Sequence, residues 1–239
     1  PDERMELYSL ALQMLLEDRD VERKVGVTYL SGPLSLRDKR EILDSLAYWM
    51  LRNNYSEAKK TQVEHQFSSS LKRLPHVKDP PSVVLQEIVE RSGVIREPIT
   101  GEIDFVHRTF LEYMGAHAAV INGDLDFLVG KAHEQNWRET IVFAAGHAQG
   151  VSRDNFVNSL LSKRAFKRRK ILADVTAACC LETAGRNLSP TVLKNLKLHA
   201  ERLFPPTDFA AAKLLAPAAA LEPSLLRGHQ GAGQDIVAA

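Results

Sequence analysis

The sequence has no excess of charge of either sign, because 31 Lys and Arg residues stand against 30 Asp and Glu residues in 239. A balanced chain has no overall field that would favour nucleic acid or an acidic membrane. No apolar run approaches the roughly 20 residues that span a bilayer, and the charged start PDERMELYSL lacks the pattern of a signal peptide. We therefore expect a soluble cytoplasmic protein with no membrane partner.

Cysteine is scarce as well, with two residues that stand next to each other, Cys179 and Cys180. An adjacent pair excludes a disulfide framework and fits a reducing cytosol. The pair lies in the helical stretch DVTAACCLETAG, where small buried packing residues are the usual role of cysteine. We expect both thiols to be part of the core.

The motifs of several enzyme classes are also missing. There is no G-x-x-x-x-G-K-[ST] loop, no acidic strand to hold Mg²⁺ beside it, and no Gly-x-Ser-x-Gly turn. His117, His133, His147 and His199 show no metal-ligand spacing with cysteine or with one another. The sequence thus predicts neither a hydrolytic enzyme nor a chain that binds a cofactor by itself. The first residue is not Met, so we expect a fragment of a longer protein.

Helical periodicity is present along most of the chain. In ELYSLALQMLLEDRD, one apolar face is predicted to be widened by further apolar residues, which implies burial against more than one neighbour. The face consists of Tyr8, Leu12, Leu15 and Leu16, and the widening residues are Leu7, Leu10 and Met14.

Three further helices are predicted before residue 94. The first covers 36–54 and begins with Ser35 as N-cap and Asp38 three residues later. The second begins near Thr61 with Glu64 as its capping partner, and the third ends at Gly93, a natural C-cap. Their inward residues are Ile42, Leu43, Leu46, Ala47, Trp49 and Met50 in the first, Val63, Phe67, Leu71 and Leu74 in the second, and Val84, Leu85, Ile88 and Val89 in the third.

The period changes in the stretch VIREPITGEIDFVH, which is typical of two strands joined by a glycine-containing turn. Alternation along the second strand places Ile103, Phe105 and His107 on one face. A helix is predicted to follow from about Thr109, with Glu112 as its capping partner. Its inner stripe is expected to be Phe110, Leu111, Met114, Ala118 and Ile121.

Three helices followed by a hairpin is the order of a winged-helix domain, and the remainder favours an α-solenoid of HEAT-like character, although no clean repeat is visible. The predicted fold is therefore mostly α with one short β-hairpin. The predicted domains are an arm helix and linker (1–34), a winged-helix domain (35–122), a helical-repeat domain (123–204) and an Ala- and Pro-rich terminal helix and tail (205–239).

Residues 3 to 150 resemble the C-terminal half of a NACHT-family NTPase, a branch of the STAND signalling ATPases. The segments RMELYSLALQMLLEDRDVER, LQEIVERSGVIRE, FVHRTFLEYMGAHAA and NWRETIVFAAG carry the resemblance. The third is the most specific, because the family ends its winged helix with Phe-x-His-x-Thr/Ser-Phe-x-Glu-Tyr/Phe. Phe105, His107, Thr109, Phe110, Glu112 and Tyr113 match this pattern. The following Met114-Gly115-Ala116 departs slightly from the two small residues usual there.

The resemblance implies that these modules close over a P-loop nucleotide-binding domain of the same parent chain. The parent would bind ADP or ATP with Mg²⁺, and His107 would contact the β-phosphate of ADP in the closed state. It further implies an unknown sensed ligand, oligomerisation on activation, and a role in signal transduction for innate immunity or antiviral defence. A ring at a helix N-terminus lies beside free backbone N–H groups, which suits a phosphate neighbour.

Other interpretations stay open at this stage. His107 could be a core histidine that caps the hairpin. The cluster SKRAFKRRK (163–170 with Ser162) suits a solvated helix junction or a contact with nucleic acid or an acidic partner. A helical scaffold for protein partners would explain 123–204 equally well.

A DNA-binding winged-helix regulator is a further alternative, but its charges have the wrong sign. The helix in the recognition position carries Glu87 and Glu90 against a single Arg91, and the wing adds acidic residues. Phosphate contacts require the opposite sign.

Overall fold

The computed structural model describes residues 3–18, 30–162, 167–203 and 212. The predicted tail (205–239) and the side chains of 163–170 fall almost wholly outside the described residues. The chain divides into two compact units. We call Glu6–Ala119 the sheet unit, and Pro1–Met5 together with Val120–Ala239 the helical unit. The prediction of four domains is not tested by this division and stays a prediction.

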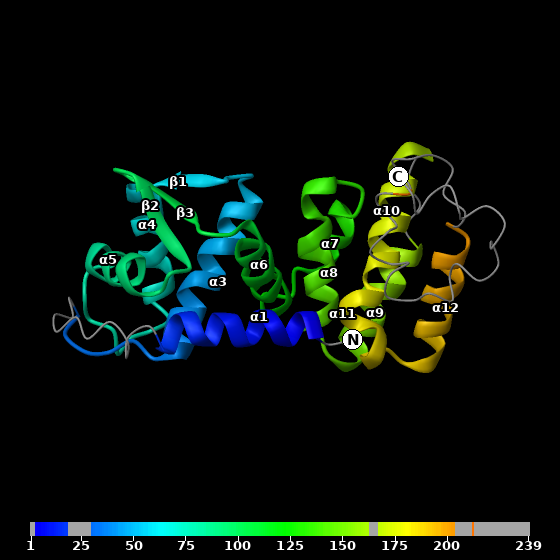
Figure 1. The fold of residues 1–239 in the computed structure, drawn as a ribbon, viewed down its shortest axis with the longest axis horizontal. Coiled ribbons are helices and arrows are strands. Elements are labelled where there is room, and N and C mark those ends of the chain that lie inside the picture. The colour runs from blue at the N-terminus through cyan, green and yellow to red at the C-terminus, as the bar shows by residue number, and fades with distance from the viewer. Residues whose placement is uncertain (1–2, 19–29, 163–166, 204–211, 213–239) are drawn as a thin grey trace, which may run out of the picture. The chain divides into compact units, whose positions relative to one another are not determined.

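Within the sheet unit, the elements of residues 36–105 follow the order helix, strand, helix, helix, strand, strand (Figure 1). The mostly helical fold with a short hairpin is thus confirmed. Its elements are α1 (Glu3–Gln13), which begins in the helical unit, the π-helical turn η1 (Met14–Asp18), α3 (Leu36–Arg52), β1 (Glu57–Lys59), α4 (Lys60–Leu71), α5 (Pro81–Arg91), β2 (Ile95–Ile99), β3 (Glu102–Phe105) and α6 (Arg108–Ile121).

The sheet contains a third strand that sequence patterns did not predict. β1 pairs with β3 in antiparallel register, Ala58 opposite Ile103, so that the strand order is β1-β3-β2. α4 contacts β1 and β3, and α5 contacts β2, so one face of the sheet is covered by helices. Burial of Ala58 and Ile103 follows from this cover.

The helix ends test the predicted caps. At α3 the backbone N–H of Asp38 donates to Ser35 Oγ at 3.2 Å and that of Ser35 to Asp38 Oδ2 at 3.0 Å, which confirms the capping box. The predicted box at Thr61 and Glu64 is wrong. The helix begins one residue earlier, and the backbone N–H of Lys59 donates to Gln62 Oε1 at 3.2 Å.

The core of the sheet unit follows the predicted stripes with two exceptions. Leu12 and Leu16 are buried, but the residues expected to widen the face of α1 are exposed instead. Ile121, expected on the inner stripe of α6, is 69% exposed, because it ends the helix beyond the sheet unit. The exposed residues are Leu7 and Leu10 of α1 and Met14 of η1.

α6 approaches α3 closely at Gly115. A Cβ atom on Gly115 would lie 2.4 Å from Leu51 Cδ1 and 3.4 Å from the backbone of Ala47 and Tyr48. A side chain at residue 115 would therefore force Leu51 to move, because the two helices pack closely there.

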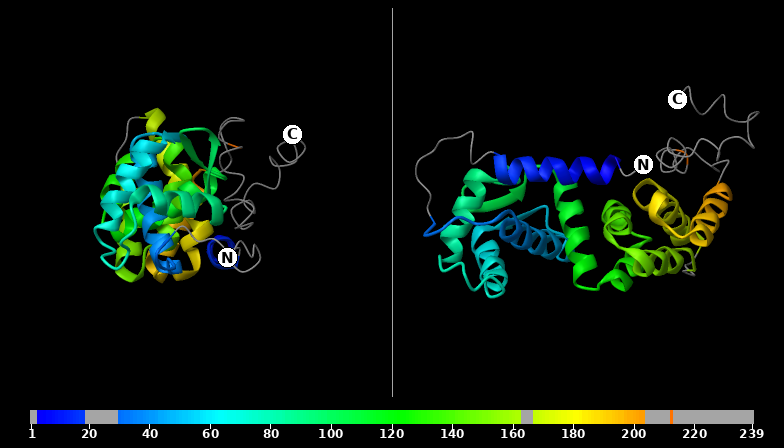
Figure 2. Two further views of the ribbon diagram at one scale, coloured as in Figure 1. Left: turned by 90° about the vertical axis from the view of Figure 1, so that its left-hand side faces the viewer. Right: turned by 90° about the horizontal axis from the view of Figure 1, so that it is seen from below.

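The described part of the helical unit contains helices and no strand, and α10 packs against α9 and α12 (Figure 2). No described helix of the chain is long and apolar enough to cross a membrane. The elements are α7 (Leu125–Lys131), the 3₁₀ turn η2 (Gln135–Trp137), α8 (Arg138–His147), α9 (Gly150–Ser162), α10 (Lys167–Cys179), α11 (Leu181–Ala184), the 3₁₀ turn η3 (Gly185–Asn187) and α12 (Pro190–Glu201).

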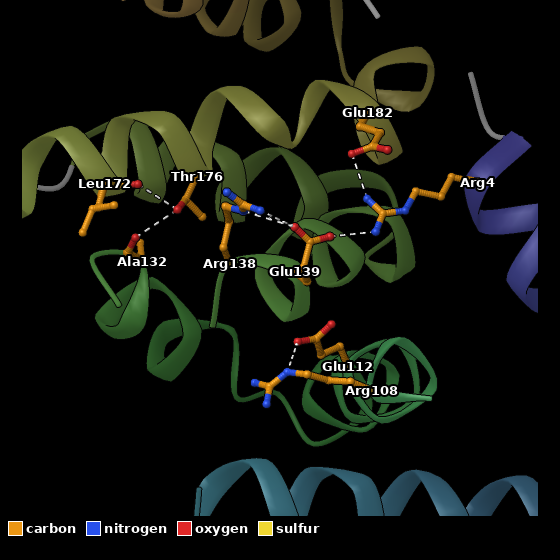
Figure 3. Close-up of polar contacts among 9 residues, drawn as sticks. All are labelled: Arg4, Arg108, Glu112, Ala132, Arg138, Glu139, Leu172, Thr176 and Glu182. Atoms are coloured by element: carbon orange, nitrogen blue, oxygen red, sulfur yellow. Dashed lines mark hydrogen bonds and ion pairs between the residues drawn. The ribbon is translucent and has the colours of Figure 1, made fainter. Parts of the chain in front are cut away.

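Polar side chains from distant parts of the sequence hold the helical unit together (Figure 3). The guanidinium of Arg4 donates to Glu139 Oε2 at 2.7 Å and to Glu182 Oε2 at 2.8 Å, and lies 4.5 Å from the centroid of the Phe143 ring. Thr176 Oγ1 donates to the carbonyl oxygen of Ala132 at 3.1 Å. These contacts anchor the first residues of α1 on α8 and α11.

Cys179 and Cys180 are buried free thiols, as predicted. Burial raises the pKa of Cys179 to about 11 and raises that of Cys180 further. Both remain protonated at neutral pH and act as small apolar residues.

Candidate functional site

His107 lies at the start of α6, just after the second strand of the hairpin. β3 ends at Phe105, and the backbone N–H of Val106 donates to the carbonyl of Val94 at 2.9 Å. The carbonyl oxygen of His107 accepts from the backbone N–H of Phe110 at 3.0 Å. His107 therefore closes the first turn of α6, which begins at Arg108, one residue before the predicted start.

The side chain of His107 is exposed, whereas Ile103 and Phe105 are buried. The predicted alternation fails at His107 because the strand ends two residues before it. Its ring packs against that of Phe110, with centroids 5.8 Å apart and an interplanar angle of 58°. The hypothesis of a core histidine is wrong, and the ring is accessible to another surface.

An open pocket of about 450 Å³ lies beside this ring. It is bounded by the end of α5, the start of β2 and the start of α6, and Gly93 shapes one wall with a positive φ of 61°. The pocket is mostly apolar, with three polar side chains. The lining residues are Leu15, Val89, Glu90, Gly93, Ile95, Arg96, Val106, His107 and Phe110.

The cations around the pocket are held by carboxylates. Arg96 donates from Nε and Nη2 to Asp104 at 2.8 and 3.1 Å, and this hydrogen bond raises the pKa of Arg96. Arg108 Nε donates to Glu112 Oε1 at 2.8 Å (Figure 3). The carboxylate of Glu112 thus holds Arg108 in this structure, and it does so from a buried position.

The arrangement can offer one imidazole nitrogen and the backbone N–H groups of the first turn of α6 to a neighbouring group. Glu90 contributes a negative charge to the opposite wall, where Gln86 Nε2 donates to it at 3.1 Å. Such a pocket can accept an apolar group and a single hydrogen-bonded acceptor. Among the described residues, the two arginines beside it, Arg96 and Arg108, are both paired with carboxylates.

Three of the four histidines singled out in the sequence for metal-ligand spacing have a carboxylate neighbour. His117 Nδ1 lies 2.7 Å from Asp44 Oδ2, His133 Nε2 lies 3.9 Å from Glu134 Oε1, and His199 Nε2 lies 3.4 Å from Asp174 Oδ1. Among the described residues no group of three or more His, Cys, Asp or Glu side chains could hold a metal ion.

Arg96 and Glu90 were not predicted as lining residues of a site. The register of the hairpin places Arg96 opposite Asp104, and this pairing could have indicated the position of Arg96 beside the site. Leu15 reaches the pocket from η1, and no local pattern indicates this contact.

The chain matches no protein-family model, no curated protein and no solved structure.

Proposed function

We propose that this chain is the regulatory and sensor part of a nucleotide-switched NACHT signalling ATPase, acting in innate immunity or antiphage defence. It has no catalytic role of its own. The winged-helix elements of the sheet unit close over a P-loop domain of the same parent chain, which binds ADP or ATP with Mg²⁺. The helical unit senses an unidentified ligand, and opening leads to oligomerisation in the cytoplasm.

The observation that supports this proposal most is the exposed ring of His107 at the first turn of α6, beside an open pocket. In the motif Phe-x-His-x-Thr-Phe-x-Glu-Tyr, Phe105 and Phe110 are buried while the histidine between them is exposed. This arrangement favours a contact between His107 and another domain.

The chemistry asked of His107 is a single hydrogen bond to a phosphate oxygen in the closed state. Backbone N–H groups at the start of α6 disfavour additional positive charge and favour an anionic neighbour. A ring nitrogen that donates one hydrogen bond to a phosphate oxygen fits this environment. The neighbouring cations are paired, so the remaining phosphate contacts must come from the P-loop domain.

One hydrogen bond to a charged group is worth about 1.5–3 kcal/mol, which shifts a closed-to-open ratio roughly ten- to a hundred-fold. His107→Leu in the intact parent should therefore speed ADP release by this factor and give signalling without ligand. The coding DNA upstream of Pro1 identifies the parent, and release of a fluorescent ADP analogue measures the effect.

His65→Leu is the matched control, because His65 is also exposed on the sheet unit but lies on α4. It should leave ADP release unchanged. If His107→Leu also leaves ADP release unchanged, His107 has no part in nucleotide retention, and the hypothesis of a helical scaffold that binds partners without nucleotide replaces the proposal.

A further inference from the structure

α1 carries apolar side chains on two opposite faces. On the inner face Leu12 and Leu16 are 0% and 1% exposed, and the ring of Tyr8 packs against Phe110 and Tyr113 with centroids 6.1 and 5.6 Å apart. The outer stripe, which we define as Leu7, Leu10 and Met14, is 63%, 52% and 61% exposed. These three residues are spaced i, i+3 and i+7, so they lie along one side of the helix.

A helix that is apolar on both sides is expected to be buried on both sides. Scattered exposed apolar residues need no explanation, but three large ones in a row form a patch that marks an interaction site. Each residue of the outer stripe remains more than half exposed in the described structure.

A polar row with two carboxylates, which we call the acidic row, runs beside the outer stripe. Glu6, Gln13 and Glu17 are all exposed, and Gln13 Nε2 donates to Glu17 Oε2 at 3.0 Å, which places these two side chains together. Glu6 lies seven residues before Gln13, on the same side of the helix. The only Lys or Arg among residues 4–17 is Arg4, and its guanidinium is held by Glu139 and Glu182.

We infer that the outer stripe of α1 is the docking face for a protein surface with an apolar centre and a rim of Lys or Arg. Opposite charge at the rim gives orientation and faster association. A second copy of this chain would bring the same acidic row and no opposite charge from this helix, and an anionic membrane would be repelled. The inference does not rest on nucleotide binding or on His107.

The test uses the whole chain and a labelled helical peptide of leucine and lysine as the probe. A peptide with glutamate in place of every lysine is its matched partner. Fluorescence anisotropy should show binding of the lysine peptide and not of the glutamate peptide. The triple variant Leu7→Gln, Leu10→Gln, Met14→Gln should bind the lysine peptide with an affinity at least about ten-fold lower than that of the unaltered chain.

The control variant Ile99→Gln, Val151→Gln removes two apolar side chains of similar exposure elsewhere, 63% and 74%, and should bind as the unaltered chain does. The charge reversal Glu6→Lys, Glu17→Lys should transfer binding to the glutamate peptide, which distinguishes a specific rim from general stickiness.

Three outcomes would overturn the inference. The first is equal binding of the lysine peptide by the triple variant and the control. The second is a self-association of the chain that the triple variant abolishes, which would make a second copy the occupant. The third is a clear loss of thermal stability in the triple variant alone, because the outer stripe would then be covered within the chain.

Discussion

The two units hold their polar side chains in different ways. In the sheet unit the ion pairs around the His107 pocket are local and their arginines are exposed: Arg108 pairs with the buried Glu112 four residues on, and Arg96 pairs with Asp104 across the hairpin. In the helical unit Arg153 is buried and donates to backbone carbonyls of Ala145 and Gly146 and, 34 residues away, of Asn187, at 3.1, 3.3 and 3.1 Å.

This difference indicates which surface can change partners. Exposed local ion pairs contribute little to stability and can be exchanged without cost to the fold. Buried bonds to backbone carbonyls cannot be exchanged, because each lost donor leaves an unsatisfied group. The surface of the sheet unit around His107 is thus suited to form and release contacts, while the bonds of Arg153 in the helical unit fix the packing of the elements that they join.

The largest effect is expected for Arg153→Met. The substitution leaves the buried carbonyls of Ala145 and Gly146, near the C-terminal end of α8, without their donor, and should cost about 3–5 kcal/mol. Each unit contains one of the two tryptophans, Trp49 or Trp137, so fluorescence in a Trp49→Phe background follows the helical unit alone. Urea unfolding in this background should show the loss.

Arg186→Met is the control for that substitution, because Arg186 lies nearby in sequence to Asn187 but is exposed. It should leave the urea midpoint within error. A midpoint that is the same for Arg153→Met and Arg186→Met would remove the contrast between the two units.

The second effect concerns the sheet unit, which depends on close helix packing. Gly115→Val would place a branched side chain against Leu51 and the backbone of α3, and overpacking of this kind costs about 2–3 kcal/mol. A Trp137→Phe background, in which Trp49 reports, should show the loss. Gly130→Val in α7, followed through Trp137 in a Trp49→Phe background, is the control, since no atom lies within 4 Å of a Cβ there. Equal effects of the two would mean that helix propensity, and not packing, is responsible.

Sequence patterns located most of the sheet unit because its determinants are local. The Ser35 and Asp38 cap, the positive φ of Gly93 after α5 and the hairpin turn at Gly101 each depend on residues a few positions apart. The strand β1 was missed because Glu57-Ala58-Lys59 is short and has the composition of a helix. Its pairing with β3 is a tertiary contact.

The candidate site was predicted in part. The position of His107 at the entry to a helix follows from its place after the hairpin, but its exposure depends on where β3 ends, at Phe105. The helical unit offers a sharper case. Arg153 has no neighbours in sequence that indicate its role, since its acceptors are backbone carbonyls brought to it by the packing of other elements.

A smaller effect is expected from acid. Burial raises the pKa of Glu139, but the hydrogen bond from Arg4 and the attraction of Arg4 and Arg138 outweigh it, so the folded pKa lies below 4.5. The unfolded chain then binds more protons, and stability present above about pH 4.5 is lost as the pH falls through the lower folded pKa. Glu139→Gln should cost about 1–2 kcal/mol at pH 7 and flatten this acid dependence.

The measurement is the urea midpoint of the helical unit between pH 7 and pH 3, followed through Trp137. Glu134→Gln is the control, because Glu134 pairs with Lys131 at a more exposed position. It should keep the acid dependence of the unaltered chain. If Glu139→Gln keeps it too, the contact with Arg4 does not couple the start of α1 to the helical unit.

The last prediction is that no binding of duplex DNA will be observed. Duplex DNA should not bind through α5, although this helix occupies the position of a recognition helix. Arg91 Nε lies 2.9 Å from Glu87 Oε1, so the positive charge of Arg91 is paired within the helix. Glu90 is exposed. Phosphates would meet net negative charge there. Anisotropy of labelled duplex DNA at low salt should stay unchanged, whereas Gln86→Lys, Glu90→Lys should create weak, salt-sensitive binding if the shape of the unit alone permits it. A salt-sensitive rise in anisotropy with the unaltered chain, abolished by Arg91→Glu, would contradict this prediction. The ion pair between Arg91 and Glu87 would then open to bind phosphate. The exposed ion pairs of the sheet unit would exchange partners with nucleic acid as well as with protein.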